Sequence, residues 1–147
     1  MDIFPRVVIV FGLGAVELWA AIPAGLALGL HPVATGIASA LGAITSALVV
    51  ALLGDRARAW LVARHGVPRD GQGHGTIRRI WDRYGVVGLG LLAPLLIGAP
   101  LGTALGLILG APVRRLLLWV SVGIVLWSAL LTAAGVLGLA GFETLRD

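Results

Sequence analysis

The chain has 147 residues, of which 59% are hydrophobic and 12% are charged. Soluble globular domains contain about 45–50% apolar and about 25% charged residues. The composition therefore argues against a water-soluble domain, and its high hydrophobicity argues against a disordered chain. The sequence contains no cysteine, which excludes disulfides, thiolate chemistry and cysteine-based metal sites. We expect one all-α integral membrane domain covering residues 1–147.

Basic residues are concentrated in one segment. All 11 basic side chains are arginines, and seven of them lie within residues 54–85: Arg56, Arg58, Arg64, Arg69, Arg78, Arg79 and Arg83. Beside long apolar stretches, such a cluster favours a cytoplasmic loop facing anionic lipid headgroups over a surface for nucleic acid. The partners we expect are therefore the lipid bilayer and its anionic headgroups.

Four apolar stretches follow one another along the chain: residues 7–30, 33–53, 85–113 and 116–142. Each contains the roughly 20 residues that a helix needs to cross a bilayer. The second and fourth carry no charge and no proline, which is typical of ordinary transmembrane helices. The second also has small residues at helical spacing, which would let another helix approach closely: Thr35, Ser39, Gly42 and Ser46.

The first and third stretches are interrupted. The first contains Glu17 and Pro23, and the third contains Pro94, Gly98 and Pro100. Proline removes a backbone donor and clashes with the preceding turn of a helix. At membrane depth such breaks persist only where they are buried in protein or line a cavity. Both stretches could be kinked full spans, or re-entrant hairpins that enter and leave the membrane on one side.

Two arginines help to choose between these alternatives. If residues 85–113 crossed the membrane fully, Arg114 and Arg115 would lie outside, against the positive-inside rule. A hairpin returns both arginines to the cytoplasmic side, so we favour hairpins. By pairing, residues 7–30 would be a hairpin entering from outside. We expect a multi-pass protein of a prokaryotic inner membrane with a cytoplasmic loop at 54–84.

An internal repeat supports this pairing. Residues 23–30 match residues 100–107 at six of eight positions, at a constant offset of 77. The expected fold is therefore two inverted halves, 7–53 and 85–142, each a Pro/Gly-broken helical hairpin followed by a transmembrane helix. Inverted repeats around a site at the membrane midplane recur in transporters.

The basic loop is amphipathic. Residues 55–64 extend the second apolar stretch with a basic face, and residues 66–75 are flexible turn material. Thr76 can cap a short helix over residues 77–84, whose arginines and aromatic residues suit the headgroup layer. We expect this loop to be a solvated connector anchored by its aromatic residues.

No enzymatic, metal or cofactor site is expected. His65, Asp70 and His74 are the candidate metal ligands, but their spacing matches no helical face. The serines of the apolar stretches have no base within those stretches, and no Walker motif is present.

Glu17 is the sharpest functional signal, because no other acidic residue lies inside an apolar stretch. A charged side chain at the centre of a membrane helix costs at least ~2.5–3.5 kcal/mol on insertion scales. We therefore expect Glu17 to carry a proton or to bind a cation. The candidate substrate-binding or ion-binding residues are Glu17, Pro23, Gly25, Pro94, Pro100, Gly102, Arg114 and Arg115.

Glycines recur at four-residue spacing in the third stretch, at Gly98, Gly102, Gly106 and Gly110, and Gly25 and Gly29 repeat part of this ladder. We interpret the ladder as a surface for close helix packing. Helix N-termini exposed by a hairpin break could instead hold an anion.

The segment Glu17-Leu-Trp-Ala-Ala-Ile-Pro23, continuing with Gly-rich sequence to His31-Pro32, resembles the opening motif of the small multidrug export protein family. Trp19 stands where that motif has an arginine. The second half resembles the family more loosely, at Tyr84-Gly-Val-Val-Gly-Leu and at Gly110-Ala-Pro-Val-Arg-Arg115. The family is similar to the DedA and SNARE-associated membrane proteins. That resemblance implies paired re-entrant hairpins and, in some members, movement of polyprenyl phosphate or other lipids.

Three functions are consistent with these features. We favour transport of a small amphiphile or ion, coupled through Glu17. The first alternative is DedA-like flipping of a phosphate-bearing lipid, with Arg114, Arg115 and the helix ends holding the headgroup. The second is a membrane scaffold that packs through its glycine faces and transports nothing. A homo-oligomer is compatible with all three.

Overall fold

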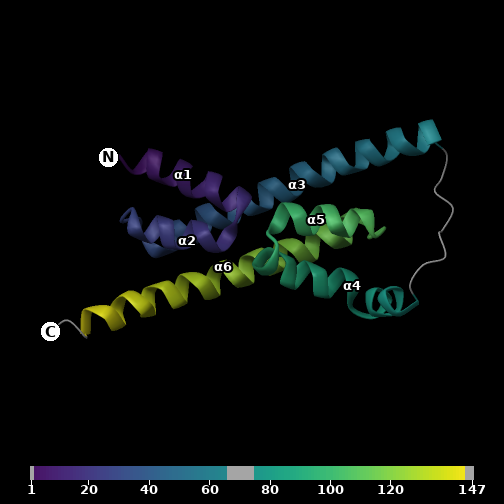
Figure 1. The fold of residues 1–147 in the computed structure, drawn as a ribbon. Helices are drawn as coiled ribbons and strands as arrows, with labels where there is room; N and C mark the ends of the chain where they lie inside the picture. The colour runs from purple at the N-terminus through teal and green to yellow at the C-terminus, as the bar shows by residue number, and fades with distance from the viewer. Residues whose placement is uncertain (1, 66–74, 145–147) are drawn as a thin grey trace.

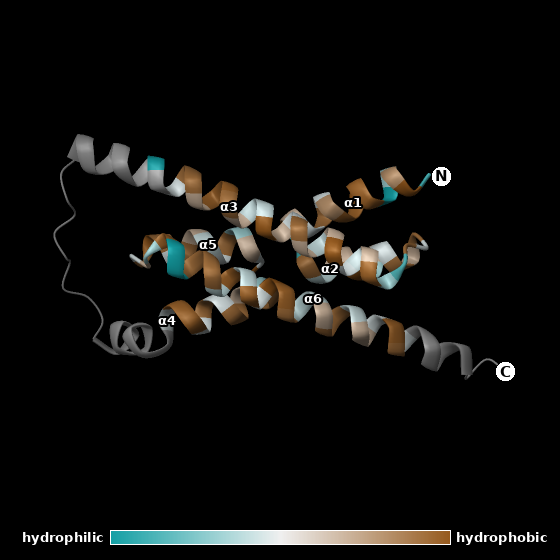
Figure 2. Ribbon diagram, turned by 180° about the vertical axis from the view of Figure 1, so that it is seen from behind, coloured by the Kyte–Doolittle hydropathy of each residue, from teal (hydrophilic) through white to brown (hydrophobic). Residues whose placement is uncertain are grey.

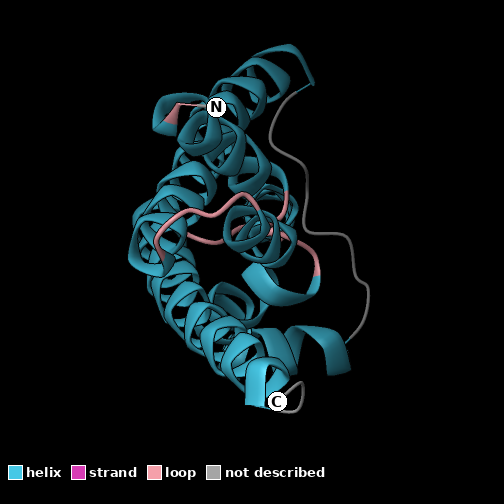
Figure 3. Ribbon diagram, turned by 90° about the vertical axis from the view of Figure 1, so that its left-hand side faces the viewer, coloured by secondary structure: helices cyan, strands magenta, loops and turns pink. Residues whose placement is uncertain are grey.

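The computed structural model describes the backbone of residues 2–65 and 75–144, and the side chains of residues 2–54, 56 and 85–138. Within these ranges every regular element is an α-helix, and short turns join the helices (Figure 3). The helices are α1 (Ile3–Val16), α2 (Leu18–Ala27), α3 (Pro32–His65), α4 (Gly75–Leu96), α5 (Ala99–Ile108) and α6 (Val113–Thr144). The all-α prediction is therefore confirmed for the described residues.

Two helical hairpins enter the middle of the molecule from opposite ends (Figure 1). Helix α1 runs from the N-terminus to the middle, and α2 folds back beside it; α4 and α5 do the same from the other end. Helices α3 and α6 each run along both hairpins and pack against one another. Both termini lie at one end, and the C-terminal end of α3 and the start of α4 lie at the other.

Two helices are long and apolar enough to cross a membrane: α3 over Pro32–Gly54 and α6 over Val113–Gly138. These segments of 23 and 26 residues are about 35 and 39 Å long, against a bilayer core of about 30 Å. Their outer faces carry large apolar side chains, and brown segments run along both helices in Figure 2. The second and fourth apolar stretches are therefore confirmed as helices of spanning length.

The other apolar helices are shorter. They are Ile3–Val16, Leu18–Ala27, Gly85–Leu96 and Ala99–Ile108. Even α1, with 14 residues, is only about 21 Å long. None of these four segments alone reaches across a bilayer core as a straight helix.

The prolines do not cause the two breaks, contrary to the sequence-based expectation. Pro23 lies inside α2, Pro94 lies inside α4, and Pro100 lies in the first turn of α5. The chain turns instead at Glu17, whose backbone is extended, and at Gly98, whose φ is +83°. A proline in the first helical turn loses no hydrogen bond, whereas a positive φ is strained for any residue with a Cβ.

The turns that follow α2 and α5 have the same geometry. Gly29 and Gly110 both have positive φ, 73° and 84°. At the next residue, the Leu30 N–H donates to the Gly25 carbonyl at 3.1 Å, and the Ala111 N–H donates to the Gly106 carbonyl at 2.9 Å. This is the Schellman arrangement, in which a left-handed residue ends the helix.

The repeat offset of 77 is therefore wrong. Helix α2 spans Leu18–Ala27 and α5 spans Ala99–Ile108, so both helix ends are displaced by 81 residues. The two turn glycines and the starts of α3 and α6 share this displacement. Alignment at 77 pairs the sixth residue of α2 with the second residue of α5. Gly, Ala and Leu are common enough in this chain for identities to accumulate in the wrong register.

Each long helix has a glycine in close contact with a hairpin, and these two glycines are also 81 residues apart. A Cβ on Gly42 of α3 would collide with the Phe11 carbonyl of α1, and a Cβ on Gly123 of α6 would collide with the Gly90 carbonyl of α4. Pro94 has no N–H to donate to the carbonyl of Gly90, four residues earlier in α4, so this carbonyl has no helical donor. The predicted small-residue contacts of the second stretch are confirmed, because Thr35 and Ser39 of α3 are fully buried.

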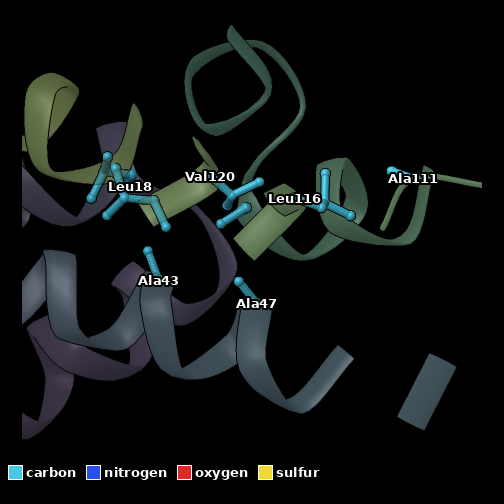
Figure 4. Packing of buried hydrophobic residues seen from close by; sticks show 8 residues of the cluster. Leu18, Ala43, Ala47, Ala111, Leu116 and Val120 are labelled. Atoms are coloured by element: carbon cyan, nitrogen blue, oxygen red, sulfur yellow. The ribbon is translucent and has the colours of Figure 1, made fainter. Parts of the chain in front are cut away.

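The hydrophobic core lies where the hairpins meet the long helices. Leu18 of α2, Ala43 and Ala47 of α3, and Leu116 and Val120 of α6 belong to one buried cluster (Figure 4). Leu18 follows the first break directly. The core therefore anchors the tip of the first hairpin between α3 and α6.

Two expectations concern the loop. Residues 55–64 continue the helix of the second stretch, as predicted, because α3 extends to His65. The separate short helix over 77–84 is wrong: α4 runs without interruption from Gly75 to Leu96. No proline precedes Pro94 in this segment, so the backbone hydrogen bonds can continue from turn to turn. The predicted turn covers residues 66–75, but Gly75 is already the first residue of α4. The rest of the turn, with Asp70 and His74, lies outside the described residues.

Candidate functional site

The two breaks touch each other in the middle of the molecule. A Cβ built on Gly98, between α4 and α5, would lie 3.1 Å from the carbonyl oxygen of Val16, the last residue of α1. The ends of four short helices therefore converge between α3 and α6 (Figure 1). Helix ends carry backbone groups without helical partners, so they offer carbonyls at α1 and α4 and N–H groups at α2 and α5.

Glu17 is the residue at the first break. Its backbone N–H donates to the Leu13 carbonyl at 2.7 Å, and its carbonyl accepts from the Ala21 N–H at 3.3 Å. It therefore ends one helix and begins the next. Its side chain does not cap α2; it is exposed, and its Oε1 accepts a hydrogen bond from the Trp19 indole Nε1 at 3.0 Å.

Trp19 is a site residue that the sequence-based reasoning did not select. Its ring is 52% exposed, so one edge holds the carboxylate while much of the ring surface stays open. An indole N–H donates but cannot accept or release a proton at ordinary pH. Spacing alone does not predict this pair, because the bond between the two side chains depends on the helix break at Glu17.

Exposed apolar side chains flank the contact between the two breaks. Val16 is 70% exposed, and Leu96 and Ile97, which immediately precede Gly98, are 71% and 41% exposed. These residues belong to the two chain segments that touch at Val16 and Gly98. The contact between the two breaks therefore carries exposed aliphatic side chains, of which Val16 directly precedes Glu17.

The structure does not bring Arg114 and Arg115 to Glu17. Both are exposed at the start of α6, and the ten residues of α5 separate them from the break at Gly98, a length of about 15 Å. The C-terminal part of α5, shortly before α6 begins, lies beside residue 54 of α3, because a Cβ on Gly54 would collide with the side chain of Leu107.

Another arginine lies toward the opposite end. The Nη1 of Arg6, on α1, donates to the Leu28 carbonyl at 2.9 Å. Leu28 ends α2, so the guanidinium binds the carbonyl end of that helix, where a cation is favoured. This contact joins α1 to the end of α2 at the open end of the first hairpin, which is the end away from the turn at Glu17.

The other candidate binding residues serve mainly as packing positions. Gly25 lies against Thr35 of α3, and Gly102 lies against Ala93 of α4. Pro94 is buried, while Pro23 is exposed on α2. The binding role of these residues stays a prediction.

The glycine ladder divides into two kinds of position. Gly102 and Gly106 pack closely, the latter against Leu116 of α6, as the packing interpretation predicts. Gly98 and Gly110 instead provide the positive φ of a break and a turn. Among the described side chains no group of three metal-ligating residues occurs.

Buried hydroxyls mark the crossing of α3 and α6. The Ser128 Oγ donates to the Gly36 carbonyl at 2.8 Å. The Oγ1 atoms of Thr35 and Thr132 are buried without a recorded hydrogen-bond partner. Thr132 lies beside Gly36, so this region is a tight helix crossing between α3 and α6.

Comparison with known proteins gives one family. A family model described as "Putative small multi-drug export protein" matches residues 17–130. The match begins at Glu17 and covers more than half of the chain. No curated protein and no solved structure matches the chain.

Proposed function

Because the chain belongs to the small multi-drug export protein family, we propose that it is an integral membrane transporter of a small amphiphile or ion, with Glu17 as its binding carboxylate. The observation that carries this proposal is the position of Glu17 at the junction of α1 and α2, where the tip of the second hairpin also lies. Transporters commonly place their binding sites at interrupted helices near the membrane midplane.

The proposed membrane arrangement has α3 and α6 as full spans and the two hairpins as re-entrant segments. The short lengths of α1, α2 and α5 support it, because none reaches across a bilayer core. The shared displacement of 81 residues between the two sets of helix ends supports two inverted halves. In this arrangement Glu17 lies at membrane depth, and the residue-54 end of α3 faces the cytoplasm of a prokaryotic cell.

Glu17 would couple transport to a proton or another cation. Its titratable carboxylate is exposed rather than enclosed in an ion pair with Arg114 or Arg115. A carboxylate can bind a cationic substrate when ionised and release it when protonated. Ionisable residues within membrane segments are commonly functional, because their burial is costly.

Proteoliposomes test this proposal. The purified wild-type protein should move a fluorescent export substrate, ethidium, in response to a pH gradient, and Glu17→Gln should abolish the gradient-driven component. Asp2→Asn, which removes an exposed carboxylate at the other end of α1, is the matched control. Gradient-driven transport by a folded Glu17→Gln protein at the wild-type rate would contradict the coupling role.

One observation favours a second candidate, lipid flipping. Arg114 and Arg115 are exposed at the turn between α5 and α6, where they could hold a phosphate headgroup. Flipping of a fluorescent polyprenyl phosphate should then fall when both residues are replaced by glutamine, while Glu17→Gln should have the smaller effect. The opposite order of effects favours the transporter with Glu17 as its binding carboxylate.

A further inference from the structure

We propose that the site at the two breaks binds an organic cation with bulky apolar substituents, held between the Glu17 carboxylate and the ring of Trp19. This inference rests on the proposed function, in which Glu17 is the binding carboxylate, and it names the chemical class of the ligand. It depends on three properties of the described residues: the partner of the carboxylate, the character of its neighbours and the position of the arginines.

The Glu17–Trp19 hydrogen bond prepares the carboxylate for a cation. The indole N–H occupies one lone pair of Oε1 at 3.0 Å and leaves Oε2 and the remaining lone pairs for a ligand. The bond also fixes the carboxylate beside the indole. A cation within about 6 Å of an indole centroid is attracted by the negative face of the ring, so both groups can act on one positive charge.

The neighbours of Glu17 do not suit a dehydrated metal ion. Calcium takes six to eight oxygen ligands, and magnesium requires a nearly octahedral set. Trp19 is the recorded side-chain partner of the carboxylate, and Val16 precedes Glu17 in the chain. Leu96 and Ile97 precede Gly98, which contacts the Val16 carbonyl. None of these four side chains offers oxygen. The carbonyl of Val16 faces Gly98. Among the described residues, besides the carboxylate, an inorganic cation would find only backbone carbonyls at the ends of α1 and α4, so it would have to keep part of its water.

An organic cation has the opposite requirements. Its charge is spread over apolar substituents, so it needs no shell of oxygen ligands. Val16 and Leu96 are 70% and 71% exposed, and they offer aliphatic surface that such substituents can cover. Contact with apolar surface adds to affinity by roughly 25 cal/mol for each Å² of apolar area removed from water.

The charge distribution disfavours an anion at this place. Glu17 is itself negative, and the described arginines lie away from the breaks. Arg6 binds the end of α2 through the Leu28 carbonyl. Arg114 and Arg115 lie beyond the ten residues of α5. No described basic side chain is recorded in contact with the carboxylate of Glu17.

Equilibrium dialysis of the full-length protein in detergent, with radiolabelled tetraphenylphosphonium as the probe, tests the proposal. Wild-type protein should bind the probe above the level of empty micelles. Glu17→Gln and Trp19→Leu should each weaken binding by about tenfold. Trp19→Phe retains a ring face but loses the N–H donor, so it should weaken binding by only about threefold. Sodium at the same concentration should not displace the probe.

Two variants serve as matched controls. Asp2→Asn removes an exposed carboxylate, and Phe4→Leu removes a ring that is 78% exposed on α1. Both should bind the probe as the wild-type protein does. Equal losses for Phe4→Leu and Trp19→Leu would overturn the proposal, and so would displacement by sodium. Thermal unfolding identifies any misfolded variant. If Trp19→Leu is misfolded, probe binding by Trp19→Phe relative to wild type tests the role of the indole instead.

The binding result is separable from the transport result. Probe binding with the predicted pattern, in a protein that transports nothing in liposomes, would reject the proposed function and retain the cation site. Transport that depends on Glu17, in a protein that does not bind tetraphenylphosphonium, would retain the function and reject this class of ligand.

Discussion

The carbonyl oxygen of Val16 lies against Gly98, so the tip of the first hairpin contacts the tip of the second. The two residues are far apart in the sequence and belong to different halves of the fold. Their contact brings the exposed carboxylate of Glu17 beside the ends of α4 and α5. A movement of either hairpin along the long helices would change this junction, and with it the surroundings of Glu17.

Gly98→Ala should destabilise the protein more than Gly110→Ala does. Both glycines have a positive φ, 83° and 84°, so both substitutions carry a similar backbone strain of about 1–2 kcal/mol. A Cβ at position 98 also presses on the Val16 carbonyl, whereas nothing lies within 4 Å of a Cβ at position 110. Thermal unfolding in detergent, followed by circular dichroism, measures the difference. Equal losses of stability would contradict the tip-to-tip contact.

Gly42→Ala and Gly123→Ala should each cost about 1–3 kcal/mol of stability, because each added methyl group would press on the backbone of a neighbouring helix. Gly12→Ala is the matched control in α1, where nothing lies within 4 Å of the new Cβ. It should be neutral or stabilise the helix by up to about 1 kcal/mol. Denaturant titration of the three variants tests this. A similar loss for Gly12→Ala would mean that helix contacts do not set the cost.

The two long helices and the presence of two interruptions could be predicted from the sequence, but not the cause of each break. The absence of charge and proline correctly identified α3 and α6, since a long apolar segment has few alternatives to a helix in a membrane. The presence of two interrupted stretches was also correct. The breaks fall at Glu17 and Gly98, two of the residues named as interruptions. The prolines were wrongly given a part in them, because a proline-based argument cannot tell which residue takes an extended backbone or a positive φ.

The register of the two halves was misread for a related reason. Identities among Gly, Ala and Leu favoured an offset of 77, whereas the helix ends correspond at 81. The useful signal was the turn chemistry: Gly29 and Gly110 are each followed within three residues by a proline, at Pro32 and Pro112, a common sign of a helix end. Trp19 could not have been assigned from spacing, because its bond to Glu17 depends on the break between α1 and α2.

Arg6→Gln should loosen the open end of the first hairpin. The substitution removes the guanidinium that donates to the Leu28 carbonyl at 2.9 Å, and we expect a loss of about 1 kcal/mol. Hydrogen exchange of the amides in the turn at residues 28–31 should accelerate. Arg114→Gln is the control, since a cation at the start of α6 is unfavourable for the helix dipole. Unchanged exchange in Arg6→Gln would contradict a stabilising role for this contact.

The membrane arrangement is the central claim, and accessibility of single cysteines tests it most directly, because the native chain has none. Cysteine is placed at positions 2, 31, 56 and 115, which are all exposed, and is probed in intact cells with an impermeant thiol reagent. Two re-entrant hairpins predict labelling from outside at positions 2 and 31 and protection at 56 and 115. Labelling at only one of positions 2 and 31, or at only one of positions 56 and 115, would contradict the account.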